Sequence, residues 1–528
     1  MIARKIALAV AGVAVAAACV PESNPGWDAP LEPIGPVMLE DAMVYLKPAF
    51  EEIIVVRPEI VDGVGSLHVE RHETGQEPSR MVASADGTQL YVLNEGDGSL
   101  SVFDIATGGV ERRDVVLESA YDRVTVDPEG DFLLLSHSGE MRSNLVVQNL
   151  NELGIVDLRG AELEARFLSL PTRAQNLVFA PPFEMDGAEQ RLVAALAESE
   201  VTLVDLTTDS PIDQWRRVQL TLSQADSVRT PTEVVFDVAN PNAVSAFVLT
   251  AEDDDVTEVV IQSGALTDST RKFTVSINQL AAGQTPGRIA MLDLPQGRRL
   301  LALDRSSPRF TLMDVVSGES VTHSLPMSVA AQHMIPFYAE VPGEERLEKK
   351  VLVYSRNSQL VTIIRPEAIA VGGETPTLGL TVQAIRMSAA PSEIRMDGSG
   401  DATRAVALHA GGNDGFTILD LLTNTEIRLQ GFSLSDLVFD STQAYGIFGN
   451  SPHMVRVDLA SGHPQVFELP ARARAIHLSP DRDAVMVRHD GRGGRFTVLP
   501  VAEPTPENGT LYEHVFLEGA LDRPADQD

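Results

Sequence analysis

Residues 79–118 constrain the fold more than any other stretch, because four short apolar segments alternate there with turn residues. The apolar segments are 81–83, 90–93, 100–103 and 115–117. Asp86-Gly87 stands between the first two segments, and this dipeptide predicts a type I′ hairpin turn, whose two central residues both need a positive φ angle. Four antiparallel strands in about 40 residues are the size of one β-propeller blade. The stretch therefore predicts one blade of a β-propeller.

Several residues at fixed places in this stretch make the pattern specific. They are Asp86-Gly87, Leu90-Tyr91-Val92, Asn94, Ser99-Leu100-Ser101-Val102, Asp104 and Thr107-Gly108. In this order they resemble the repeat of the YVTN family of bacterial β-propellers, which is similar to the WD40 repeat. The resemblance implies a propeller scaffold. It implies no particular reaction, because one fold hosts many unrelated functions.

The same pattern of short strands recurs along the chain at intervals of about 40–60 residues. We count nine units, whose first strands begin at Met81, Asp122, Asn176, Glu233, Arg288, His333, Glu393, Asp436 and Ala475. Residues 40–78 hold further strand-like pieces, interpreted as lead-in strands or as an outer strand that closes the ring. Long helical periodicity is absent from the sequence, and no linker rich in Gly, Ser or Pro divides the units into two rings.

We therefore predict an all-β fold. The prediction is a single β-propeller of four-stranded blades over residues 40–518, with lead-in strands at 40–78 and repeat units from residue 79. About 7–9 blades are expected, because nine units exceed the usual size of a propeller ring.

Residues 1–18 are predicted to be the signal peptide of a lipoprotein. Arg4 and Lys5 precede an apolar run over 6–18, which is too short to span a bilayer of ~30 Å. The run ends in three alanines before Cys19, the only cysteine of the chain, and this ending resembles the bacterial lipobox. The resemblance implies that Cys19 becomes a lipidated N-terminus. The alternative is an ordinary secretory signal that ends near a cysteine.

The residues that follow the lipobox suggest where the protein is held. Val20 follows Cys19 in place of an aspartate, which resembles the sorting pattern of outer-membrane lipoproteins. Residues 19–39 are rich in proline and are predicted to form an extended tether. Residues 519–528 are predicted to be a disordered tail. We expect a protein of the cell envelope, lipid-anchored at the outer membrane, on its periplasmic face or at the cell surface.

The chain is strongly acidic, with 75 Asp and Glu against 41 Lys and Arg and a formal net charge of -34. Such a surface repels polyanions, so nucleic acid is excluded as a partner, and a self-repelling monomer is expected. The single cysteine also excludes disulfides, thiolate metal sites and covalently attached c-type haem.

Four arginines near the starts of first strands are the candidate binding residues. Arg80 and Arg123 each stand seven residues before the glycine of the first hairpin turn, Gly87 or Gly130. Arg288 and Arg474 stand near the starts of their own first strands, without strict register. Guanidinium groups around a channel could bind a carboxylate or phosphate. The alternative is that these arginines pair with carboxylates of the blades or cover apolar surface.

Aspartate recurs at the end of third strands and is interpreted as structural. It stands at Asp104, Asp157, Asp205, Asp314, Asp420 and Asp458. One such residue per blade cannot form one active site, whereas an Asp carboxylate can accept turn N–H groups. The histidines are scattered, and His68 and His72 lie about 13 Å apart on a strand, too far to bind one metal ion. We predict no metal and no cofactor.

Two functions fit these observations. The first is a membrane-anchored lipoprotein whose propeller binds another envelope protein, a peptide or a glycan. The second is an envelope enzyme of the lactonase or hydrolase type, because propellers that resemble this one have active sites at the channel. The sequence shows no nucleophile elbow, Walker motif or Rossmann fingerprint, so binding is the favoured prediction and enzyme activity the alternative.

Overall fold

The structure, a computed structural model of the chain, describes residues 33–516 except for short internal segments. The segments outside the description are 107–108, 140–148, 161–162, 209, 211–212, 221–228, 241, 252, 268–270, 295–296, 341–346, 370–376, 397–403, 410–414, 450, 491–492, 503 and 506–507. The predicted signal peptide, Cys19, most of the tether and the tail 519–528 lie outside the described residues. In the part that is described, no helix has the length and apolar character needed to cross a membrane.

The described residues form ten four-stranded antiparallel sheets, each built from consecutive strands, and we call these sheets blades 1 to 10. Blade 1 is β1 (Ile34–Met38), β2 (Met43–Lys47), β3 (Glu52–Val61) and β4 (Val64–Glu73). Blade 2 is β5 (Pro78–Ala83), β6 (Gln89–Asn94), β7 (Ser99–Ala106) and β8 (Gly109–Val116). Blade 3 is β9 (Arg123–Val126), β10 (Phe132–Ser136), β11 (Glu152–Asp157) and β12 (Ala165–Ser169). Blade 4 is β13 (Asn176–Phe179), β16 (Leu192–Leu196), β17 (Glu200–Asp205) and β18 (Trp215–Gln219), with a separate hairpin of β14 (Phe183–Met185) and β15 (Ala188–Gln190). Blade 5 is β19 (Pro231–Asp237), β20 (Ala243–Thr250), β21 (Asp255–Ser263) and β22 (Phe273–Ala281).

The second half of the chain repeats the arrangement. Blade 6 is β23 (Pro286–Leu294), β24 (Gly297–Asp304), β25 (Arg309–Asp314) and β26 (Ser320–Ser324). Blade 7 is β27 (His333–Glu340), β28 (Leu347–Tyr354), β29 (Leu360–Ile369) and β30 (Thr377–Arg386). Blade 8 is β31 (Pro391–Met396), β32 (Arg404–His409), β33 (Gly415–Asp420) and β34 (Thr425–Gln430). Blade 9 is β35 (Leu434–Phe439), β36 (Gln443–Phe448), β37 (His453–Asp458) and β38 (Pro464–Glu468). Blade 10 is β39 (Ala473–Leu478), β40 (Ala484–His489), β41 (Arg495–Pro500) and β42 (Thr510–Tyr512). Two 3-10 turns, η1 (Pro48–Phe50) and η2 (Gly264–Thr267), complete the regular structure of the described residues.

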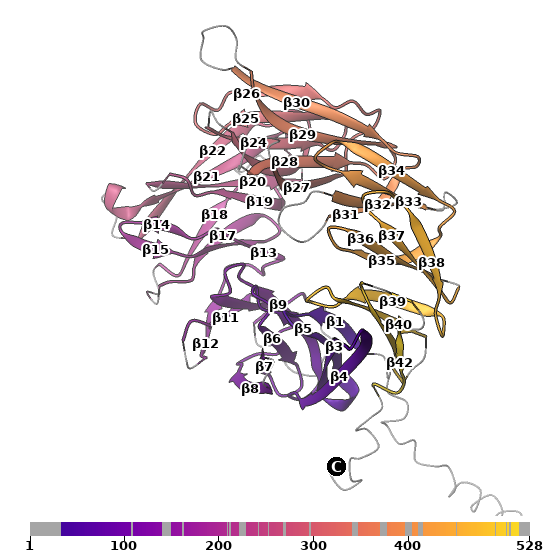
Figure 1. Cartoon of the computed structure of the whole chain (residues 1–528). Coiled ribbons are helices and arrows are strands. Elements are labelled where there is room, and N and C mark those ends of the chain that lie inside the picture. Colours follow the sequence, from indigo (N-terminus) through magenta and orange to yellow (C-terminus); the bar gives the residue numbers. More distant parts are fainter. Residues whose placement is uncertain are drawn as a thin grey trace, which may run out of the picture.

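The hydrophobic core is divided into ten clusters of buried side chains, one in each gap between neighbouring blades. Each sheet therefore buries both faces against its neighbours, and its strands read as continuous apolar runs such as Leu133-Leu134-Leu135 in β10. One cluster joins blade 10 to blade 1, with Tyr45 and Ile54 packed among Met486 and Phe496. The blades follow one another around the molecule in chain order, and blade 1 lies beside blade 10 (Figure 1). The fold is a closed β-propeller.

The number of blades is ten, so the prediction of about 7–9 is corrected. Residues 40–78, interpreted as lead-in strands, contribute most of a blade of their own, which starts at Ile34 inside the predicted tether. Its first strand, β1, has the sequence Ile-Gly-Pro-Val-Met. Gly and Pro are depleted in strands, and they interrupt the apolar pattern by which the other first strands are recognised. The sequence pattern therefore does not reveal blade 1, the additional blade.

The hairpin turn at Asp86-Gly87 also differs from the prediction. β5 ends at Ala83 and β6 begins at Gln89, so the loop has the five residues 84–88. Gly87 has a φ of 75°, while Asp86 is not among the residues with positive φ, which rules out a type I′ turn. The Asp86 carboxylate instead accepts hydrogen bonds from the Ser84 hydroxyl at 2.6 Å and the Thr88 N–H at 3.0 Å. These side-chain bonds stabilise the longer loop.

Five of the six recurring third-strand aspartates accept turn N–H groups, as predicted, and Asp104 does not. Asp458 accepts the N–H groups of Ala460 and Ser461, and Asp314 accepts those of Val316 and Ser317. Asp157, Asp205 and Asp420 accept turn N–H groups in the same way. Asp104 accepts instead from Gln89 and Arg113.

A buried hydroxyl group recurs in the middle of the third strands. It belongs to Ser101, Thr202, Thr257, Thr311, Thr362, Thr417 and Thr497. In three blades it bonds the side chain that ends the second strand, at 2.9 Å to Asn94, 2.8 Å to His409 and 2.7 Å to His489. In blade 2 this contact explains why the repeat has Asn94 and Ser101, because the Asn94 amide donates to the Ser101 hydroxyl and both groups are buried.

Candidate binding site

The first strand of each blade lies nearest the axis of the ring, and first strands of several neighbouring blades contact one another (Figure 1). All four predicted arginines lie on such strands: Arg80 on β5, Arg123 on β9, Arg288 on β23 and Arg474 on β39. The strands that carry them are thus the first strands of their blades, and a role of the four arginines in binding stays a prediction. They belong to blades 2, 3, 6 and 10, of which only blades 2 and 3 are neighbours.

In three other blades an acidic residue occupies the position in the first strand that Arg80 and Arg288 occupy in theirs. Arg80 and Arg288 each follow an irregularity in the pairing of the first two strands, and the same position holds Glu233 in blade 5, Glu393 in blade 8 and Asp436 in blade 9. This position of the first strand therefore carries a basic side chain in some blades and an acidic one in others, and in blade 10 it is Ala475.

The arginines differ in what they contact. Arg288 pairs with Glu233 at 3.7 Å, although more than half of its side chain is exposed. Arg123 donates to the backbone oxygen of Gln175 at 2.7 Å, which ties blade 3 to the start of blade 4. Arg80 and Arg474 are both exposed. Arg288 and Arg123 thus link neighbouring blades, and Arg288 does so by pairing with a carboxylate, which was the structural alternative for these residues.

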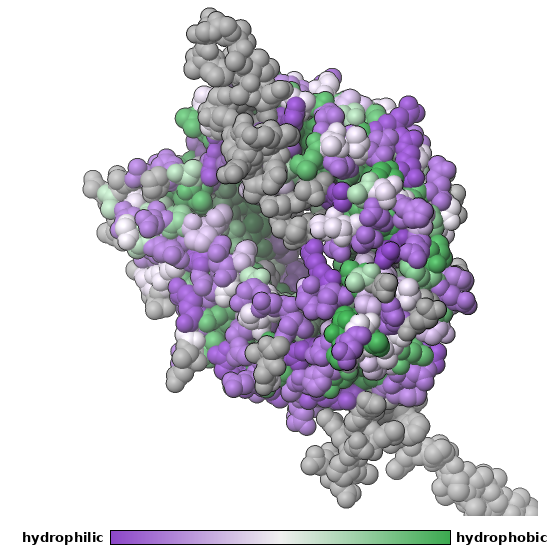
Figure 2. Space-filling view, in the orientation of Figure 1, coloured by the Kyte–Doolittle hydropathy of each residue, from purple (hydrophilic) through white to green (hydrophobic). Residues whose placement is uncertain are grey.

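A cavity of about 720 Å³ lies at the opposite ends of the first strands from these arginines. Its walls come from the last residues of β1, β31, β35 and β39 and from the turns after β1, β5 and β39, so blades 8, 9, 10, 1 and 2 all contribute. None of the four predicted arginines lines it. The space-filling view shows a molecule hollowed at its centre, with a mainly hydrophilic surface around the hollow (Figure 2). A cavity of this size suits a small organic ligand or a side chain of a partner.

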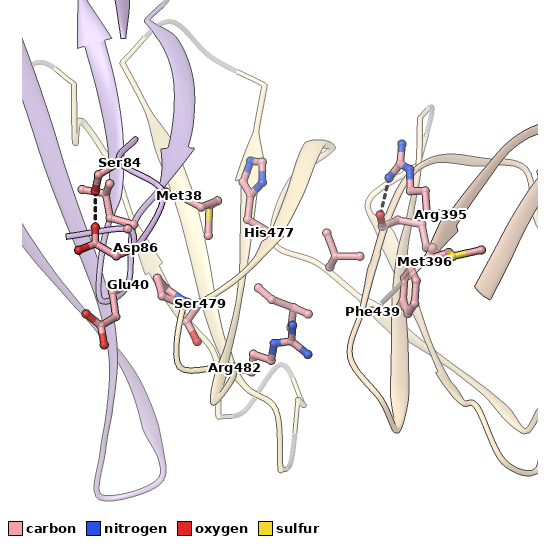
Figure 3. A pocket seen from close by; sticks show the side chains of 17 residues that line it. Met38, Glu40, Ser84, Asp86, Arg395, Met396, Phe439, His477, Ser479 and Arg482 are labelled. Carbon is pink, nitrogen blue, oxygen red and sulfur yellow. Dashed lines mark hydrogen bonds between the residues drawn. The ribbon is translucent and has the colours of Figure 1, made fainter. Parts of the chain in front are cut away.

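The close view shows how the walls are arranged (Figure 3). Met38, Glu40, Ser84 and Asp86 lie on one side, Arg395, Met396 and Phe439 on the other, and His477, Ser479 and Arg482 between them. Apolar side chains and polar groups thus alternate around one space. Such a mixed lining is typical of ligand sites, where apolar walls supply affinity and a few polar groups fix orientation.

Arg395 organises the wall that blades 8 and 9 form. Its guanidinium donates to Glu393 at 3.0 Å, to Asp436 at 3.3 Å and to the backbone oxygen of Leu437 at 2.7 Å. Asp436 in turn accepts the N–H of Ile476 in blade 10 at 3.3 Å. The hydrogen bonds that Arg395 donates to the Glu393 carboxylate raise the pKa of Arg395 above its ordinary value. This network fixes three first strands relative to one another, and it already occupies the donors of Arg395 on the nearest carboxylates.

His477 is the polar group of the cavity whose needs are not met within the described residues. Its Nε2 atom is buried and has no hydrogen-bond partner there. Burial lowers the pKa of His477 below its ordinary value, against the opposing influence of Asp436, so the ring is neutral at pH 7. The Nε2 atom has almost no accessible surface, so it lies behind the wall of the cavity and does not face the open space.

Sequence reasoning did not single out the residues of this cavity. His477 was one of several dispersed histidines, and Met38 fell in the predicted tether. The available signal was positional, because His477, Arg395 and Leu437 all come one or two residues before the end of a first strand. No group of three or more His, Cys, Asp or Glu side chains that could hold a metal ion occurs within the described part of the chain.

Comparisons with known proteins concern the fold alone. No family model matches the chain, and no curated protein matches it. Among solved structures, the chain is similar to the dihydro-heme d1 dehydrogenase NirN in complex with DHE, at 13% identity and a TM-score of 0.42, covering 81% of this chain and 74% of that one. It is similar to the WD40 domain of SCAP from fission yeast, at 12% identity and a TM-score of 0.38, covering 78% and 89%. It is also similar to apo AztD from Citrobacter koseri, at 9% identity and a TM-score of 0.33, covering 73% and 95%.

Proposed function

We propose that this protein is a binding protein of the cell envelope, anchored through a lipid on Cys19, that holds a ligand or partner at the mouth of its central channel. The observation that carries this proposal is the cavity of about 720 Å³ between blades 8, 9, 10, 1 and 2, whose wall combines Met38, Phe439 and His477 with charged side chains. The repeated aspartates are engaged in turns, so the propeller itself acts as a rigid frame.

The proposed partner is another envelope protein, a peptide or a glycan that reaches the cavity. The arginines at the other end of the channel offer a second contact region for an anionic group, of which Arg80 is an exposed example. Nucleic acid is disfavoured by the net charge of -34. The proposed state is a monomer that acts at the outer membrane, without a cofactor.

Photo-crosslinking in intact cells tests this proposal. A photoreactive residue at Met38, which lines the cavity, should give a discrete adduct, because a bound molecule lies within its reach. The same residue at Val316, which is 92% exposed on a turn of blade 6, is the control for random collisions. Cys19→Ala should release the protein from the membrane fraction and abolish an adduct that depends on anchoring. Equal labelling from Met38 and Val316 would contradict a binding site at the channel mouth.

One observation favours the second candidate, an envelope hydrolase or lactonase. His477 lines the cavity of about 720 Å³, and burial lowers the pKa of its imidazole, which favours the neutral form that a general base needs. Turnover of a lactone or ester panel by the purified protein, lost in His477→Gln, would support this candidate. Absent turnover contradicts this candidate and leaves binding as the function, whereas turnover that is unchanged in His477→Gln would contradict only the role of His477.

A further inference from the structure

Blade 7 departs from the repeat at one position of its third strand. In blades 2, 4, 6 and 8 an aspartate stands three residues after the buried hydroxyl of the third strand, as Asp314 does after Thr311. In blade 6 this carboxylate pairs with Arg299 on the neighbouring second strand, at 2.6 Å. In blade 7 the same spacing from Thr362 leads to Arg365. An arginine therefore occupies the position where these blades carry a carboxylate.

The second strand of blade 7 brings another cation to the same position. β28 pairs with β29 through Leu352 opposite Ile363, and this register, continued by two residues, places Lys350 opposite Arg365. Leu352 and Ile363 pack in the cluster between blades 7 and 8. Side chains two residues apart on a strand share a face, so Lys350 and Arg365 both lie on the side of blade 7 that meets blade 8.

The two cations have no carboxylate partner among the described residues. The side chain of Lys350 is 4% exposed, and Nε of Arg365 is fully buried without a hydrogen-bond partner. Burial lowers the pKa of the Lys350 ammonium below its ordinary value, and the nearby charge of Arg365 lowers it too, against the opposing influence of Glu348. Within the described part of the chain, the other nitrogen atoms of the pair do not count among the fully buried, unpartnered atoms, so they stay within reach of a small anion.

We propose that Lys350 and Arg365 form a binding site for the carboxylate group of a small organic acid, in the gap between blades 7 and 8. The bound carboxylate takes the place that the aspartate has in blade 6, and it relieves the repulsion between two cations that are largely shielded from water. A guanidinium group binds a carboxylate through two parallel hydrogen bonds, and the ammonium group adds a third donor. Because Lys350 is nearly buried, only a small carboxylate fits. Neither residue lines the cavity of about 720 Å³, so this site is independent of the proposed function.

Thermal melting of the purified full chain tests the site with acetate as the probe. Acetamide has the shape of acetate without its charge, and potassium chloride holds the ionic strength constant throughout. Acetate should raise the melting temperature as its concentration increases, because it binds the folded state, and acetamide should not. In Lys350→Gln the acetate concentration needed for a given rise should increase about tenfold, because one charge-assisted hydrogen bond is lost.

A second variant supplies the carboxylate from the chain itself. Arg365→Asp restores the aspartate of the repeat opposite Lys350, so that attraction replaces repulsion. It should raise the melting temperature in the absence of acetate and abolish the response to acetate. The matched control is Arg299→Gln in blade 6, where the carboxylate of Asp314 is already present. It should lower the melting temperature and leave the response to acetate unchanged.

Several outcomes would overturn the inference. They are an equal response to acetate and acetamide, an undiminished acetate response in folded Lys350→Gln, and a lower melting temperature of Arg365→Asp. A peptide of four glutamates, at the same concentration of carboxylate, should give a smaller response than acetate, because the site is nearly closed. A larger response to the peptide would contradict a small acid as the ligand. Circular dichroism shows whether each variant is folded, and the crosslinking result at Met38 bears on the cavity alone.

Discussion

The gap between blades 10 and 1 differs from the gap between blades 4 and 5 in how it is held together. Blades 4 and 5 are joined covalently by the chain, and their interface is mainly aliphatic, with Leu203 and Val218 packed on Val244 and Ala246. Blades 10 and 1 are the last and the first blade along the chain, and they meet where the ring closes. Every blade takes its four strands from one continuous segment, so no strand exchange closes the ring. Side chains and backbone groups alone must close it.

The closing gap has features suited to that task. Residues after β42 run back to blade 1, where the buried Lys47 donates to the backbone oxygen of Phe516 at 2.6 Å and to Glu52 at 3.0 Å. Arg71 donates to the backbone oxygen of Val515 at 2.5 Å. The rings of Tyr45, Phe496 and Phe516 pack with centroids 5.2–5.8 Å apart. The comparison teaches that closure depends on a short segment near the end of the chain, whereas the other gaps are also tethered by the chain.

Of the variants that test this comparison, Phe516→Ala should reduce the stability of the fold the most. The ring is 1% exposed and packs in the closing gap, so its loss should lower the free energy of unfolding by about 3–5 kcal/mol. Urea denaturation followed by circular dichroism gives this value.

The matched control is Phe416→Ala, which removes an equally buried ring from the gap between blades 8 and 9. It should cost a similar free energy, but only Phe516→Ala should speed hydrogen exchange in β3, β4 and β40 below the unfolding transition. An opened closing gap exposes strand edges, which also favours aggregation. The same exchange pattern in both variants would show that the closing gap is not special.

Lys47→Met should have the next largest effect. Its ammonium group is buried between Glu52, the oxygen of Phe516 and the ring of Phe50, whose centroid lies 3.8 Å away. Removing one member of a buried ion pair costs about 3 kcal/mol, because the remaining carboxylate stays buried without its partner.

Lys272→Met is the comparison in the gap between blades 4 and 5. Lys272 pairs with the buried Asp205 at 2.5 Å, but its own side chain is 30% exposed. Water can reach the site, so the loss should be smaller than at Lys47, and thermal melting of the two variants side by side gives the order. A larger loss at Lys272 would mean that covalently joined gaps rely on ion pairs more than the closing gap does.

The sequence predicted the propeller because each blade repeats the same local chemistry. The third strands of blades 6 and 8, with Thr311 and Asp314 or Thr417 and Asp420, carry the hydroxyl and the turn carboxylate at the same spacing. Closure could not be predicted, since Lys47 and Phe516 lie 469 residues apart and neither belongs to a motif. The cavity was missed for the same reason: it exists only where the ends of five first strands meet around the axis.

Asp458→Asn should reduce the stability of the fold the least. It changes a turn aspartate of the kind that recurs in several blades. Hydrogen bonds from the hydroxyl and the N–H of Ser461 hold the pKa of the Asp458 carboxyl below its ordinary value. A carboxyl group with a lowered folded-state pKa stabilises the fold above its unfolded-state value, near 4, and this stabilisation is lost as pH falls through the folded-state pKa. The melting temperature of the variant should therefore be slightly lower than that of the wild type at pH 7, and the two should converge as the pH falls below the folded-state pKa. Because Asp458 lies on a turn of blade 9, away from the cluster that closes the ring, hydrogen exchange of β3 and β4 should stay as in the wild type. A difference in melting temperature that persists at low pH would show that the asparagine disturbs the turn through its shape rather than through its charge.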